Sequence, residues 1–228
     1  AALAGRVSAR AMDFLLALTL GLLLFLLVDT LHEGAEIARE LPGAYQGLAL
    51  LALGIGVAYL ALEGLGAWLR GRQSALGAAL VTSLLVAIGI GLHNFGEGLA
   101  IGAAYALGEA ALGTLLIVGF TLHNTTEGLA IVAPLARTRV SSTRLLVLGL
   151  IGGLPTILGA WLGGFIYSPV FSVLFLGFGA GAIAQVVVQI ARGAAGDRSI
   201  SGYLSGAPAA SGLLVGFVLT YATGILVQ

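Results

Sequence analysis

The chain has 228 residues, of which 59% are hydrophobic and only 9% are charged. Soluble domains carry about a quarter charged residues, so this composition excludes a domain surrounded by water on all sides. The formal net charge is zero, so no basic patch indicates a nucleic-acid partner, and the absence of Cys excludes disulfides and thiolate metal sites. The absence of Lys excludes a Schiff-base lysine, and with it a retinal protein.

Seven segments are long and apolar enough to be membrane-spanning helices, which need roughly 20 mainly apolar residues each. Turn and loop compositions separate them, and none alternates as a strand would. Because lipid requires closed backbone hydrogen bonding, we expect an all-α polytopic membrane helix bundle forming a single transmembrane domain over residues 1–228. The expected spans are 12–37, 44–69, 75–107, 111–136, 144–167, 169–192 and 208–227.

The ten Arg residues predict the orientation of these spans. With seven alternating spans, nine of the ten fall on one side of the membrane, and only Arg39 falls on the other. Loops on the cytoplasmic side carry the excess of basic residues. We therefore expect a multi-pass protein of the cell membrane, with the visible N-terminus cytoplasmic and the C-terminus outside.

Acidic residues gather at the outer end of the first span. Asp29, Glu33, Glu36 and Glu40 are spaced by four, three and four residues, which places them on one helix face if the helix continues. His32 lies among them. The cluster is either a solvated helix end or an outer entrance that concentrates cations, for which the candidates are Asp29, His32, Glu33 and Glu36.

The pattern His-Asn-x-x-Glu-Gly-Leu-Ala occurs twice, thirty residues apart, at 93–100 in the third span and 123–130 in the fourth. A His and a Glu four residues apart lie on one helix face, one turn apart, so each pair can hold one ion. The two spans are antiparallel neighbours joined by a short loop. Both pairs lie well inside their spans, so we expect them at similar depth in the membrane. The predicted metal ligands are His93, Glu97, His123 and Glu127.

Two imidazoles and two carboxylates suit Zn²⁺ and its first-row neighbours, whereas a soft Cu(I) site would use thiolates. A carboxylate at mid-bilayer costs roughly 2.5 kcal/mol or more, so packing alone explains two of them poorly. Asn94 and Asn124 follow the two His residues and are candidates for a secondary metal position. The ligands must be deprotonated, so we expect metal binding to weaken at low pH.

We therefore predict transport of a divalent transition metal toward the cytoplasm by alternating access, with Zn²⁺ first and Fe²⁺, Mn²⁺ or Cd²⁺ as alternatives. Glu63 and Gln185 are candidates for an exit path, together with Gln189, although each can equally be a packing or helix-end residue. Two other functions stay open: an intramembrane zinc hydrolase and a metal-binding membrane subunit that does not transport. A hydrolase is disfavoured because the His-Glu-x-x-His motif is absent, so we expect no enzyme.

The two motifs resemble those of the ZIP (Zrt/Irt-like) family of metal transporters, which carry His-Asn-x-Pro-Glu-Gly in the fourth helix and a related motif in the fifth. Residues 180–182 and 186–188, Ala-Gly-Ala and Val-Val-Val, also look like the family's seventh helix. The resemblance implies that the seven spans are ZIP helices two to eight, with the first transmembrane helix absent from this chain. It also implies an elevator-like movement and a homodimer.

The sequence departs from the family pattern at four positions. Gly96 and Thr126 replace the family's Pro before each motif Glu. Leu154 replaces the Glu of the family's sixth-helix Glu-Pro pair, and Gln189 replaces its seventh-helix Glu. In the family, the Glu at the Leu154 position contributes to a second metal position. The resemblance therefore implies a complete primary site and an incomplete secondary one, and we expect a single bound metal ion.

Overall fold

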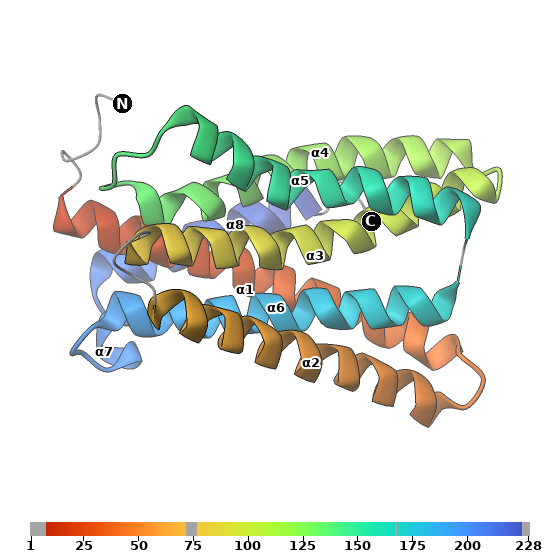
Figure 1. Cartoon of the computed structure of the whole chain (residues 1–228), viewed down its shortest axis with the longest axis horizontal. Coiled ribbons are helices and arrows are strands. Elements are labelled where there is room, and N and C mark those ends of the chain that lie inside the picture. Colours follow the sequence, from red (N-terminus) through yellow and green to blue (C-terminus); the bar gives the residue numbers. More distant parts are fainter. Residues whose placement is uncertain (1–7, 72–76, 167, 225–228) are drawn as a thin grey trace.

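The structure is a computed structural model that describes residues 8–71, 77–166 and 168–224 (Figure 1). All regular structure in these residues is helical, so the predicted all-α class is confirmed. The elements are α1 (Ala9–Glu40), α2 (Ala44–Gly71), α3 (Ala78–Ala106), α4 (Ala110–Val132), the 3₁₀ turn η1 (Ala133–Leu135), α5 (Ser142–Phe165), α6 (Pro169–Ala195), α7 (Ile200–Leu204) and α8 (Ala207–Gly224).

Six of these helices, α1 to α6, are long and apolar enough to cross a membrane. The described part of α8 is apolar but shorter, and the rest of its expected span, to residue 227, lies outside the described residues. The polytopic helix bundle predicted from composition is therefore confirmed. The short helix α7 was not predicted: it forms within an expected loop because the Ser199 hydroxyl accepts a hydrogen bond from the Gly202 amide and caps it.

Successive long helices run in opposite directions, which separates charge between the two ends of the bundle (Figure 1). Glycines in the left-handed region, Gly43 (φ 83°) and Gly108 (φ 81°), allow the tight connections α1–α2 and α3–α4. These connections lie at the end that we call the acidic end, where α1 carries residues 29–40. The opposite end, which we call the Arg-rich end, carries Arg10, Arg70, Arg137, Arg139, Arg144, Arg192 and Arg198.

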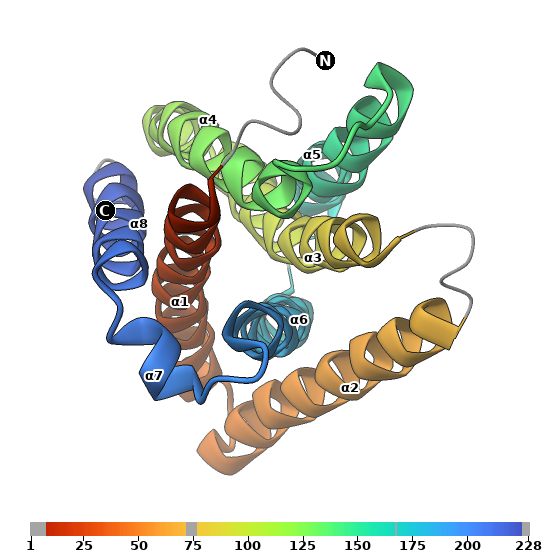
Figure 2. The same cartoon turned by 90° about the vertical axis from the view of Figure 1, so that its left-hand side faces the viewer.

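Helices α1, α3 and α6 form the inner part of the bundle, and α2, α4, α5 and α8 lie around them (Figure 2). Side chains such as Leu26, Leu85 and Ile183 on the inner helices are fully buried. The outer helices expose large apolar side chains, such as Ile157 and Trp161 on α5. A helix exposed in this way suits contact with lipid, which leaves the inner helices to carry polar side chains.

Glycines bring α3 and α5 into backbone contact along most of their length. A Cβ atom at Gly98 or Gly102 of α3 would overlap the carbonyl oxygen of Thr156 or Ala160 on α5. Gly159 of α5 meets the Phe95 carbonyl in the same way. Such small residues allow helices to approach closely where no hydrophobic effect drives them together. The contact fixes the segment of α3 that carries the first motif.

We predict that Gly159→Ala lowers the stability of the folded protein by about 1–3 kcal/mol, because the added methyl group must push α3 away. Thermal unfolding of the purified protein in detergent measures the change. Gly153→Ala is the matched control, since Gly153 lies on the same helix and nothing lies within 4 Å of its added Cβ. An equal loss in both variants would contradict the packing role.

Tyr203 joins α7 to the Arg-rich end of α1 by a hydrogen bond. Its hydroxyl donates to the Asp13 carbonyl oxygen at 2.8 Å, and the Arg198 guanidinium lies 5.1 Å from its ring centroid and 3.7 Å from the Asp13 carboxylate. Burial, reinforced by the Asp13 charge, raises the pKa of Tyr203 to about 12, so the phenol stays protonated and keeps donating. The α6–α8 connection is thereby held against α1.

Candidate metal centre

Three ionisable side chains from two helices converge in the interior of the bundle. His93 and Glu97 lie one turn apart on α3, and Glu127 comes from α4. His93 Nε2 lies 3.3 Å from Glu97 Oε1 and 3.9 Å from Glu127 Oε1, and one ligand atom from each residue lies within 4.8 Å of the others. Each of the three is at most 5% exposed. Such a group could hold a metal ion.

Asn124 closes the opposite side of the two carboxylates. With its amide oriented to satisfy both neighbours, Nδ2 donates to Glu127 Oε2 at 3.1 Å and to Glu97 Oε2 at 3.2 Å. Each carboxylate therefore turns one oxygen toward His93 and the other toward Asn124. The amide orients the carboxylates but adds no positive charge, and two carboxylates from different helices thus lie close together beside one imidazole. A divalent cation is the partner that this charge favours.

Thr30 of α1 determines which nitrogen of His93 faces the carboxylates. Its single hydroxyl hydrogen goes to the Leu26 carbonyl oxygen at 2.7 Å, so the Thr30 oxygen accepts the bond that joins it to His93 Nδ1 at 2.9 Å. His93 therefore carries hydrogen on Nδ1. In the neutral ring, Nε2 then presents its lone pair to the space between Glu97 and Glu127, as a metal ligand must.

We predict that Thr30→Val weakens divalent-metal binding by about 10–100-fold, because a valine of similar shape cannot accept from Nδ1 and the ring loses its orientation. Equilibrium binding of Co²⁺ to the purified protein measures the affinity, and Thr30→Ser should restore it. Thr19→Val is the control: Thr19 is equally buried on α1, and its hydroxyl donates to the Leu15 carbonyl oxygen of the same helix. Unchanged Co²⁺ affinity in Thr30→Val would contradict the assignment.

The structure brings three of the four predicted metal ligands together, and the side chain of the fourth, His123, lies outside the described residues. Of the two candidates for a secondary position, only Asn124 contacts the ligand carboxylates. Asn94 instead donates from Nδ2 to the Gly152 carbonyl oxygen of α5 at 3.0 Å. The two Asn residues of the repeat therefore have different roles.

The candidates for an outer entrance separate into two pairs. His32 and Glu36 form an exposed pair with 3.7 Å between Nε2 and Oε1, as expected of a solvated helix end. Asp29 and Glu33 are half-buried. Glu33 lines a pocket of about 230 Å³ that extends from Glu109 at the acidic end to Gly96, which precedes the candidate ligand Glu97 in the sequence. Glu33 is therefore the candidate with the clearest connection to the metal centre.

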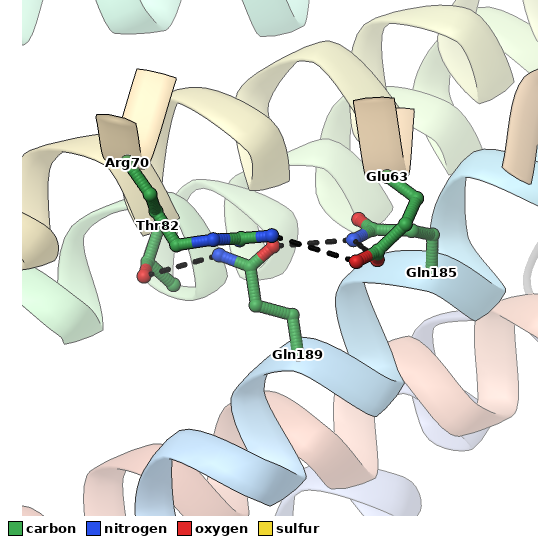
Figure 3. Close-up of polar contacts among 5 residues, drawn as sticks. All are labelled: Glu63, Arg70, Thr82, Gln185 and Gln189. Atoms are coloured by element: carbon green, nitrogen blue, oxygen red, sulfur yellow. Dashed lines mark hydrogen bonds and ion pairs between the residues drawn. The ribbon is translucent and has the colours of Figure 1, made fainter. Parts of the chain in front are cut away.

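The three candidates for an exit path lie together. Gln185 donates from Nε2 to Glu63 Oε2 at 2.9 Å and to Gln189 Oε1 at 3.3 Å (Figure 3). Sequence reasoning missed Thr82, which bonds Gln189, and Thr30, which bonds His93. A polar residue within a long apolar run was the available signal for Thr30, but its partner lies 63 residues away along the chain.

No protein-family model matches the chain, and no curated protein sequence matches it. The function is therefore inferred from the fold and the metal centre themselves.

Proposed function

We propose that this membrane protein transports a divalent transition metal ion, which it binds through His93, Glu97 and Glu127. One observation carries the proposal: the three side chains converge within 4.8 Å inside a bundle of apolar helices, each nearly inaccessible to solvent. Ionisable groups in membrane-spanning helices are costly, and where they occur they typically line ion pathways. A structural role would be fulfilled equally well by apolar side chains.

The donor set favours metals of borderline hardness. One imidazole nitrogen and two carboxylates suit Zn²⁺, and they also suit Fe²⁺, Mn²⁺ and, among larger ions, Cd²⁺. Asn124 holds the two carboxylates in place through hydrogen bonds and adds no charge to the site. The charge that attracts the ion is therefore limited to that of the two carboxylates, which favours binding that is reversible. We take Zn²⁺ as the first substrate to test, in agreement with the resemblance of the two motifs to those of the ZIP family.

The packing of the bundle supports alternating access. Helices α3 and α5 are joined by direct backbone contact, with α4 beside them, whereas α1, α8, α2 and α6 form a second group. The three side chains lie on the first group, and His93 contacts the second group through Thr30 of α1 and through Gly179 of α6, which packs against its backbone. We propose that the two groups move relative to each other, so that an ion enters at the acidic end, outside the cell, and leaves at the Arg-rich end, in the cytoplasm.

We predict that Glu97→Gln lowers Zn²⁺ uptake into proteoliposomes by at least about tenfold, since it removes a ligand charge and keeps the shape of the side chain. Asp197→Asn is the matched control, because it removes one carboxylate from an exposed loop at the Arg-rich end. Uptake that is equal in Glu97→Gln and the wild type would contradict the role of Glu97 as a metal ligand.

Binding and flux must be measured on the same preparation, because a metal-binding subunit that does not transport would share the site. Transport requires saturable Zn²⁺ flux by the wild-type protein as well as Glu97-dependent binding. Binding without flux would contradict transport and identify the non-transporting alternative. Metal-dependent hydrolysis of lipid or peptide substrates, lost in Glu97→Gln, would instead identify an intramembrane hydrolase.

A further inference from the structure

A second polar cluster lies between α2, α3 and α6, toward the Arg-rich end (Figure 3). The Glu63 carboxylate is its centre: Oε1 lies 3.5 Å from Arg70 Nη2, and Oε2 accepts from Gln185 Nε2 at 2.9 Å. Gln189 extends the cluster to α3, since its Nε2 donates to Thr82 Oγ1 at 3.4 Å. Five polar side chains from three helices thus form one connected cluster, in which Arg70 and Gln185 contact the Glu63 carboxylate directly.

The position of this cluster relates it to the metal centre. On α6, Gly179 packs against the backbone of His93, so that an added Cβ would lie 3.0 Å from His93 Cα. Gln185 follows six residues later, about 9 Å further toward the Arg-rich end at 1.5 Å per residue. From Glu63 a pocket of about 300 Å³ continues past Gln189 to the exposed residue Arg192. The cluster therefore lies between the metal centre and that end of the bundle.

One buried polar atom of the cluster can accept a further contact. Gln185 is only 1% exposed, and both hydrogens of its Nε2 are directed to Glu63 and Gln189. Its Oε1 is buried and accepts no hydrogen bond from any residue in the described part of the chain. A buried amide oxygen without a donor is costly, and the Nε2 atom of the same amide is bonded to the Glu63 carboxylate. The amide oxygen and the carboxylate both favour an electropositive partner.

Arg70 only partly fulfils this role. Its pair with Glu63 is long, at 3.5 Å, and the two side chains are 37% and 47% exposed. Ion pairs that are exposed to this degree contribute little, so a divalent cation that reaches Glu63 can displace the guanidinium. The guanidinium is then a tethered counter-ion, which neutralises Glu63 when no other cation is present.

We propose that Glu63, Gln185 and Gln189 form a second, all-oxygen cation site, which receives the metal ion on its way from the His93 centre and which Arg70 occupies in the absence of the ion. This inference rests on the proposed transport function. The site offers one formal negative charge and no imidazole, so it binds more weakly than the primary centre. A station on a transport path must bind weakly enough to release its ion.

Binding of Mn²⁺, followed by electron paramagnetic resonance on the purified full chain in detergent, tests the proposal. Mn²⁺ accepts oxygen ligands and reports directly on bound and free ion. The wild type should bind two ions per chain, one tightly and one weakly. Glu97→Gln should lose the tight site and keep the weak one. Glu63→Gln should lose the weak site and keep the tight one, and Glu63→Asp, which retains the charge, should preserve it at least in part.

The role of Arg70 has its own test. Arg70→Gln should tighten the weak site by up to about fivefold, the factor expected from removing one partly exposed ion pair. Arg192→Gln is the matched control, because it removes one positive charge from the same pocket without touching the Glu63 pair. An equal effect of both variants would overturn the displacement of Arg70 by the ion.

The two proposals fail in different ways. Zn²⁺ flux with no Glu63-dependent Mn²⁺ binding overturns the second site and leaves transport standing. Mn²⁺ binding at Glu63 in a protein without flux supports the site and overturns transport. A Glu63→Gln variant that loses both sites and unfolds at a lower temperature, while Glu63→Asp also loses the weak site, assigns the cluster to packing and overturns the inference.

Discussion

Two carboxylates buried side by side in an apolar helix bundle impose the strongest requirement on this structure. Glu97 and Glu127 both turn one oxygen toward His93 and the other toward Asn124, so their negative charges are held close and cannot separate. In a medium of low polarity, such a pair needs positive charge nearby. The surrounding helices hold the two carboxylates in place, and their packing determines how a cation could reach them.

The inner helices meet that requirement through backbone proximity rather than through large side chains. The glycines of α3 let α5 lie against it, and Gly179 lets α6 lie against the backbone of His93. Dense packing of this kind defines the position of the motif in this structure. The polar residues of the neighbouring helices, Thr30 on α1 and Gln185 on α6, can then reach across without large gaps. A single substitution at a contact glycine should consequently disturb the metal centre as well as the packing.

The fold was largely predictable because its determinants are local in the sequence. Long apolar segments and their separating turns predict the helices, and the spacing of His93 and Glu97 predicts their shared face. Glu127 was predicted as a partner because its motif repeats in an antiparallel neighbour. The contact with Thr30, in contrast, depends on where the bundle places α1 relative to α3, since the two residues are 63 positions apart in the sequence and no local pattern encodes their contact. The different roles of Asn94 and Asn124 were unpredictable for the same reason, since both occupy the same position of the repeat.

The bond between Thr30 and His93 has a mechanical consequence, because it joins α1 to α3. A hydrogen bond weakens steeply once its geometry is lost, so a slide of α3 along α1 by even one residue, about 1.5 Å, would disengage the imidazole from its support. The orientation of the His93 imidazole is thereby tied to the relative position of two helices. In the proposed transport cycle, displacement of α3 would therefore remove the support of the imidazole and weaken the metal site in a single movement, without a separate step for release.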